Sequence, residues 1–114
     1  MTNERRDNVC DFRKIHIIDE EIKRNQKALA ELREISVSAA LIRSYERLLQ
    51  EQTEELVQAK FDAENSIMGI ADDTTRLIAK MRYIDLLSWT EIGRALNYDR
   101  TAVYRKLKKE IKKL

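Results

Sequence analysis

Hydrophobic residues recur at helical spacing along two long stretches of the chain. In the first stretch they step by three and four positions, with Asn25 as the one polar member, at Ile15, Ile18, Ile22, Leu29 and Leu32. In the second stretch Gln52 is the polar member, and the apolar positions are Ile42, Tyr45, Leu49, Leu56, Ala59 and Ala63. Each stretch predicts a long amphipathic helix with one buried seam.

The two seams cannot be covered together if the chain forms one straight helix. They are offset by 27 residues, from Ile15 to Ile42, which at about 100° per residue places them on roughly opposite sides. A chain reversal at residues 35–38, where β-branched residues alternate with serines, predicts an antiparallel hairpin instead. This pairing sets Asn25 opposite Gln52, and we expect the amides to hydrogen-bond, because an unpaired buried amide costs about 1–3 kcal/mol. There are two alternatives: Asn25 and Gln52 are simply polar residues on a partly solvated seam, or the chain forms one continuous helix that dimerises.

The remainder of the chain predicts three shorter helices. Gly69 is expected to end or bend the second long helix, because Gly is the usual residue of a left-handed C-terminal cap, and residues 72–74 offer side-chain oxygens that cap the next helix. The apolar positions of that helix are Leu77, Ile78, Met81 and Ile84.

Residues 88–91, Ser-Trp-Thr-Glu, form a capping box that begins another helix. Asn97 tolerates a positive φ and Asp99 can cap the last helix, so a short connection is predicted between two steeply crossing helices, as in a helix-turn-helix. Gly93 is expected at their closest approach, where a larger side chain would hold the helices apart.

The last helix separates into two faces at about 100° per residue. Its predicted buried face consists of Val103, Leu107, Ile111 and Leu114. The opposite face begins with polar and aromatic groups and becomes cationic, as a major-groove recognition helix requires. The candidates for reading DNA bases are Arg100, Thr101, Tyr104 and Arg105. The candidates for contacting DNA phosphates are Lys108, Lys109, Lys112 and Lys113.

Charge is distributed unevenly along the chain. Residues 100–114 hold seven bases and one acid, a net +6, whereas residues 1–99 hold 15 bases and 19 acids, a net −4. Such asymmetry is typical of a protein with one surface that meets a polyanion. It favours double-stranded DNA as the partner of the last helix.

Composition supports an all-α fold and argues against several function classes. The chain has no Pro, two Gly and 37% charged residues, which suits thin helical layers. It contains neither a secretory h-region nor the ~18 apolar residues of a membrane span, so we expect a cytoplasmic protein. A metal-ligand set, a phosphate-binding Gly loop and a nucleophile with a base are all missing, so we expect no catalysis and no cofactor.

These patterns divide the chain into three parts. We predict a disordered N-terminus over residues 1–12, a helical hairpin arm for association over residues 13–68, and a helix-turn-helix that binds DNA over residues 72–114. The lone His16 is expected at the surface or in the seam.

Residues 81–93, MRYIDLLSWTEIG, resemble the LRY-x-x-G-L-S-W-x-E-I-A signature of sigma factor region 4. Residues 97–105, NYDRTAVYR, resemble its G-x-S-R-x-x-V-x-R turn and recognition helix. The chain is similar to small phage-encoded late transcription regulators of the ArpU and RinA type. The chain has Gly93 where the family has Ala, Asn97 where it has Gly, and Leu86 where it usually has Gly, which implies that the Leu86 turn needs no positive φ.

The resemblance implies a sequence-specific DNA-binding transcription regulator derived from a phage or prophage. In such a regulator the residues that approach the major groove are Arg100, Thr101, Tyr104 and Arg105. RNA polymerase is a further candidate partner, and we expect a dimer formed through the arm. Two alternatives remain: the small DNA-recognition subunit of a phage terminase, and an adaptor that binds RNA polymerase.

Overall fold

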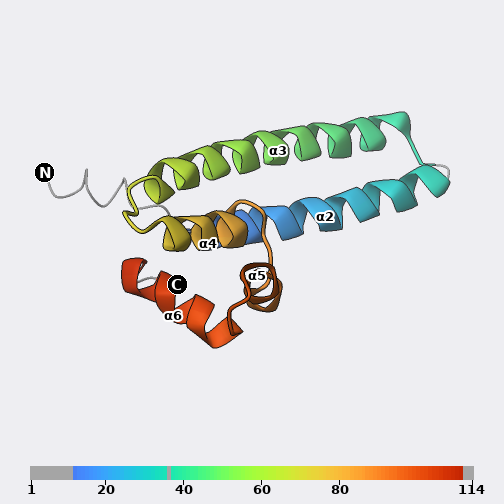
Figure 1. The fold of residues 1–114 in the computed structure, drawn as a ribbon. Helices are drawn as coiled ribbons and strands as arrows, with labels where there is room; N and C mark the ends of the chain where they lie inside the picture. Colours follow the sequence, from blue (N-terminus) through green and yellow to red (C-terminus); the bar gives the residue numbers. More distant parts are fainter. Residues whose placement is uncertain (1–11, 36, 112–114) are drawn as a thin grey trace, which may run out of the picture.

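The structure, a computed structural model, describes residues 12–35 and 37–111. These residues form helices joined by short turns (Figure 1), and no strand occurs among them. The helices are α2 (Phe12–Glu34), α3 (Ala39–Ile67), α4 (Asp73–Tyr83), α5 (Trp89–Leu96) and α6 (Arg100–Glu110). The predicted all-α class is therefore confirmed. Within the described ranges, no helix combines the length and the apolar content needed to cross a bilayer.

Helices α2 and α3 lie side by side and run in opposite directions (Figure 1); they are called the arm below. The chain reverses direction between α2 and α3, and Ser38 caps α3 by accepting a hydrogen bond from the Leu41 amide at 3.2 Å. The hydrogen bond expected in the seam is present, since Asn25 Nδ2 donates to Gln52 Oε1 at 2.9 Å and both residues are half-buried. This polar contact fixes how α2 aligns with α3.

The α3–α4 turn differs from the sequence prediction. Helix α3 ends at Ile67, its cap residue Met68 is right-handed, and Gly69 does not adopt a positive φ. Amide hydrogen bonds from Gly69 to Ser66 O at 3.2 Å and from Ile70 to Ile67 O at 2.9 Å close the turn instead. The predicted left-handed glycine cap is therefore wrong. Hydrogen bonds from each amide to the carbonyl three residues earlier satisfy the last carbonyls of the helix instead.

Helix α4 begins at an Asp72 cap, whose carboxylate accepts from the Thr75 amide at 2.9 Å and the Thr75 hydroxyl at 2.8 Å. These hydrogen bonds hold the pKa of Asp72 below its usual value. The buried face of α4 differs in part from the predicted one. Ile78 is buried and Met81 and Ile84 pack partly against the apolar cluster, but Leu77 is 45% exposed, and Thr75, Ala79 and Tyr83 are buried as well. Tertiary packing determines which face of α4 is buried, because α4 packs against the arm, α5 and α6 at once.

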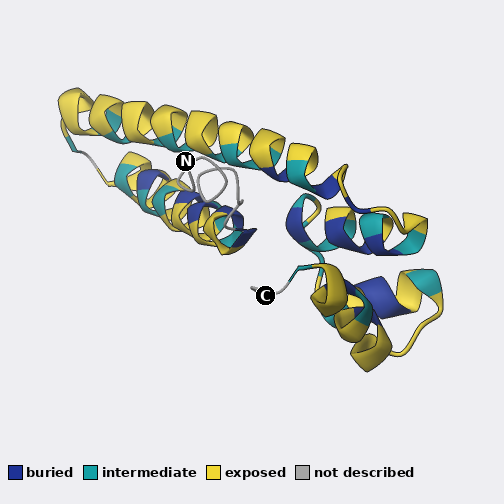
Figure 2. Cartoon of the chain, turned by 90° about the vertical axis from the view of Figure 1, so that its left-hand side faces the viewer, coloured by how far each residue is buried: buried dark blue, intermediate teal, exposed yellow. Residues whose placement is uncertain are grey.

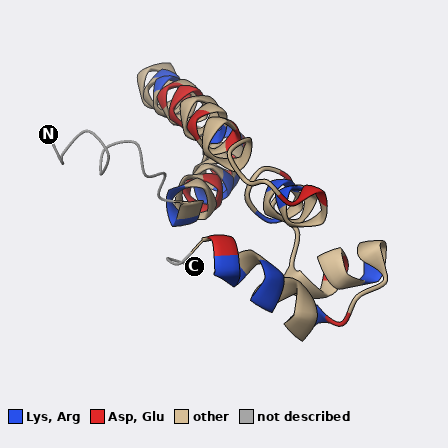
Figure 3. Cartoon of the chain, turned by 60° about the vertical axis from the view of Figure 1, so that its left-hand side comes forward, with Lys and Arg blue, Asp and Glu red and all other residues tan. Residues whose placement is uncertain are grey.

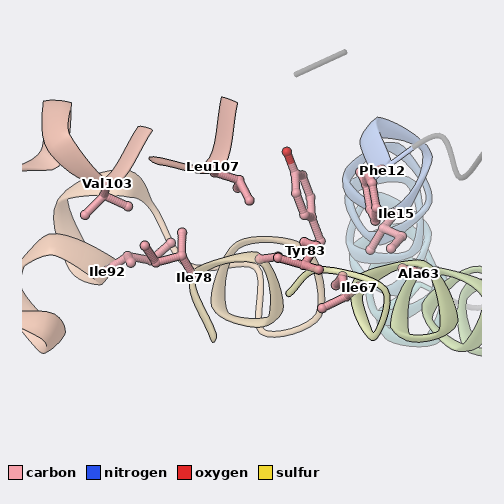
Figure 4. Packing of buried hydrophobic residues seen from close by; sticks show 11 residues of the cluster. Phe12, Ile15, Ala63, Ile67, Ile78, Tyr83, Ile92, Val103 and Leu107 are labelled. Carbon is pink, nitrogen blue, oxygen red and sulfur yellow. The ribbon is translucent and has the colours of Figure 1, made fainter. Parts of the chain in front are cut away.

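One continuous apolar cluster joins the arm to α4, α5 and α6 (Figure 4). At its arm end Phe12 stacks on Tyr83, with ring centroids 4.3 Å apart and an interplanar angle of 24°. At the other end Ile78 lies beside Ile92 and Val103, all fully buried. Phe12, which the sequence analysis places in the N-terminal segment, thus begins α2, and residues 1–11 lie outside the described part.

The phenol of Tyr83 should make stability fall at high pH. Burial raises the pKa of Tyr83 to about 12 from an ordinary value of 10.0, so the folded state favours the neutral phenol. The neutral phenol therefore contributes fully to the free energy of unfolding below pH 10, and this contribution is lost as pH rises from about 10 to 12. Denaturant titrations at several alkaline pH values should show this loss in the wild type and a smaller one in Tyr83→Phe, which keeps the stack on Phe12. An unchanged pH profile in Tyr83→Phe would contradict the assignment.

Candidate nucleic-acid interface

Helix α5 begins with the predicted capping box. The Ser88 hydroxyl accepts from the Glu91 amide at 3.0 Å, and the Glu91 carboxylate accepts from the Ser88 amide at 2.8 Å. These two reciprocal hydrogen bonds lower the pKa of Glu91 and leave fewer amides unpaired at the start of the helix. The start of α5 is therefore set by local sequence, and with it the place where α5 leaves the preceding turn.

The turn from α5 to α6 spans residues 97–99. Asn97 adopts the left-handed conformation with φ 62° and ψ 41°, and its amide and that of Tyr98 both donate to Gly93 O. Asp99 then caps α6 by accepting from the Thr101 amide at 3.0 Å. The three residues reverse the chain tightly, so α5 and α6 pack against each other directly.

Gly93 lies at the closest approach of the two helices, as the sequence predicts. A Cβ atom at this position would stand 2.6 Å from Tyr98 O and 3.3 Å from Arg100 N. Both neighbours are backbone atoms that cannot rotate away, so glycine is required for this crossing.

Helix α6 buries one face and exposes the other (Figure 2). Val103 and Leu107 are fully buried, and Ile111 packs partly against the same cluster. The sequence-predicted residues that the structure describes are all exposed on α6: Arg100, Thr101, Tyr104, Arg105, Lys108 and Lys109. Lys112, Lys113 and Leu114 of the prediction lie outside the described residues. The structure thus brings six candidate residues onto one exposed helix.

The exposed face of α6 is cationic (Figure 3). Its helix contains five bases and one acid, Glu110. Lys106 points instead toward the start of α4, where its Nζ lies 3.8 Å from the Asp72 carboxylate. Arg100, Arg105 and Lys109 form no ion pair with any residue in the described part of the chain. Their charges are therefore available to an external anion.

A ladder of cations and aromatic rings joins α4 to α6. The Arg82 guanidinium lies 4.4 Å from the centre of the Trp89 ring, and Trp89 meets Tyr104 edge to face with centroids 5.2 Å apart. Lys108 Nζ lies 5.7 Å from the Tyr104 ring centre. Tyr104 is consequently held by packing and is 36% exposed, which limits how freely it can reach a ligand.

Arg82 also holds the turn before α5 and is a positioning residue that the sequence analysis missed. Its guanidinium donates to Leu87 O at 3.1 Å. It also faces His16 of α2, a half-buried residue whose pKa is lowered first by burial and then by the charge of Arg82. Trp89, which directly follows the Ser88 cap, packs between Arg82 and Tyr104.

The turn at Leu86 corrects another expectation. Leu86 has φ 61°, so the turn does use a positive φ although the residue is leucine. This conformation costs a non-glycine residue roughly 1–2 kcal/mol. The cost is offset because the Leu86 side chain packs partly against the apolar cluster, and because the Leu87 amide donates to Met81 O at 3.0 Å.

Comparison with known proteins places this arrangement in a family. No curated protein and no solved structure matches the chain. Residues 31–114 match the family described as "Protein of unknown function (DUF1492)". The match begins near the end of α2 and includes α3, α4, α5 and α6, and with them the whole candidate interface. Because it covers most of the sequence, the chain belongs to the family DUF1492.

Proposed function

We propose that this chain is a sequence-specific DNA-binding transcription regulator, in which α5 and α6 act as a helix-turn-helix of the sigma region 4 kind. In this proposal α6 enters the major groove, and the arm serves for association. The resemblance to regulators of the ArpU and RinA type supports a phage or prophage origin. The proposal assigns base reading to the first turns of α6 and phosphate contacts to its later turns.

The observation that carries the proposal is the two-sided character of α6. Its aliphatic side is fully buried at Val103 and Leu107, while Arg100, Arg105 and Lys109 are exposed and have no ion pair with described residues. Cations left free on a rigid helix are matched to the phosphate backbone, which supplies most of the affinity for DNA. A guanidinium near the helix start can also donate two hydrogen bonds to a guanine edge.

Charge elsewhere on the molecule agrees with this orientation. Along α3, residues 51–64 hold five acids and one base, Lys60. A polyanion would be repelled from that half of the arm and attracted to α6, which orients the encounter before any specific contact forms. Figure 3 shows the bases gathered on α6 and mixed charges along the arm.

The experiment is a DNA-binding titration with matched variants. A preferred sequence is first selected from a random duplex library, and binding is then followed by fluorescence anisotropy at several salt concentrations. We expect Arg105→Ala to cost about 1–3 kcal/mol on the selected sequence and to relax its base preference. Lys109→Ala should weaken all sequences alike and lower the slope of log K against log salt by about 1. Lys27→Ala, an exposed base on α2, is the control and should change little.

The possible outcomes separate the proposal from its rivals. Equal, sequence-blind losses from Arg105→Ala and Lys109→Ala would refute base reading. Negligible DNA affinity at physiological salt would refute DNA binding and favour the adaptor that binds RNA polymerase. A ring-sized mass in solution together with DNA binding would favour the terminase subunit.

A further inference from the structure

The outer face of α3, together with its cap residue Met68, carries an apolar stripe that no described part of the chain covers. It consists of Val57, Phe61 and Met68, which are 62%, 61% and 69% exposed. Their spacings of four and seven residues place them on one side of the helix. That side lies about 130° around α3 from the seam that packs on α2. Figure 2 shows the outward side of α3 as continuously exposed.

Acidic residues border this stripe. Glu54 and Glu64 project on either side of it at about 100° per residue. Both are exposed, and neither forms an ion pair with a residue that the structure describes; Glu54 accepts only a 3.5 Å hydrogen bond from Gln50. Lys60, the one base between residues 51 and 64, is half-buried and forms no ion pair with Glu64 or with another acid that the structure describes. The border therefore carries uncompensated negative charge.

Charge complementarity selects the occupant of this face. A DNA duplex is excluded by the acids. If two copies paired through this face with their α3 helices parallel, Glu54 would face Glu54 of the second copy, and Glu64 would face Glu64. An antiparallel pair that brings Val57 onto Phe61 would set Glu54 against Glu64. Like charges so placed oppose association. A partner whose apolar face is bordered by Lys or Arg would instead be attracted by Glu54 and Glu64.

We propose that the stripe of Val57, Phe61 and Met68, with its Glu54 and Glu64 border, docks an amphipathic helix of another protein whose apolar face is flanked by bases. Helix-in-groove and helix-on-helix recognition of this kind uses apolar anchors at helical spacing. The face belongs to α3 and is separate from α6. The inference therefore does not depend on DNA binding.

The test uses the full chain and a synthetic helical peptide with leucines along one face and lysines beside them. Fluorescence anisotropy in 150 mM salt should detect binding of this peptide and none of a peptide with glutamate in place of lysine. Phe61→Ser should weaken binding by about tenfold or more. Ile17→Ser is the matched control, because Ile17 is 57% exposed on α2, and should change binding less than about twofold. Glu54→Gln with Glu64→Gln should reduce affinity and its salt dependence.

Three results would overturn the proposal: Phe61→Ser and wild type binding the peptide alike, equal binding of the acidic and basic peptides, or sedimentation showing a dimer that Phe61→Ser dissociates. The last would make a second copy the occupant. Thermal melts of each variant establish that it remains folded. DNA affinity of Phe61→Ser should equal that of wild type, so failure of the docking proposal and failure of DNA binding are distinguished.

Discussion

Ile78→Ala is expected to lower the free energy of unfolding by about 2–5 kcal/mol. Ile78 is fully buried between α4 and the α5–α6 pair, so truncation leaves a cavity that its neighbours on three helices cannot fill together. Urea denaturation followed by circular dichroism measures the loss. The variant should unfold at a lower midpoint with a similar slope, because the surface exposed on unfolding scarcely changes.

The neighbouring residue provides the matched control. Leu77→Ala removes the same class of side chain one position earlier, but Leu77 is 45% exposed, so the expected loss is below about 1 kcal/mol. Equal losses in Leu77→Ala and Ile78→Ala would mean that α4 presents the face that the sequence pattern predicts rather than the one described.

Gly93→Ala is expected to destabilise the chain by about 1–3 kcal/mol, and Gly93→Val by more. Alanine in the middle of a helix ordinarily stabilises by about 0.5–1 kcal/mol relative to glycine, so the sign of the effect is itself diagnostic. Here the new Cβ would lie 2.6 Å from Tyr98 O, and the turn or the α5–α6 crossing must shift.

A second substitution in α5 controls for helix propensity. Ala95 is exposed in the same helix, and Ala95→Gly should cost about 1 kcal/mol. Gly93→Ala and Ala95→Gly should therefore both destabilise the chain, although the first adds a methyl group and the second removes one. A Gly93→Ala variant that is more stable than wild type would show that the helices do not cross so closely.

The features that could be predicted from the sequence are those set by local chemistry or by a repeated pattern. The Ser88–Glu91 capping box, the left-handed Asn97 and the Asp99 cap each depend on side chains reaching backbone groups a few residues away. The Asn25–Gln52 hydrogen bond was predictable because two long seams, each with one polar member, can pair in only a few registers. The two faces of α6 follow from the same periodicity.

The features that could not be predicted depend on several elements meeting at once. The pairing of Phe12 with Tyr83 joins residues far apart in sequence and has no periodic signal. The face that α4 buries is chosen by four neighbouring helices, which override its apolar periodicity. Leu86 adopts a positive φ because packing outweighs the usual steric cost. Residue type alone predicts a negative φ at this position.

The apolar cluster that runs from Phe12 to Leu107 joins the arm and the cationic helix α6 in one packed core. The molecule measures 53 × 41 × 17 Å, and the far end of the arm, where α2 connects to α3, lies away from α6 (Figure 1). A protein docked on the stripe near the α4 end of α3 would therefore have its position relative to α6 set by the packing of this cluster. Lengthening both arm helices by one matched heptad would move their far end by about 10 Å while the seam keeps its alignment. A partner docked on the stripe of Val57, Phe61 and Met68 would stay in place, so its position relative to α6 would not depend on arm length.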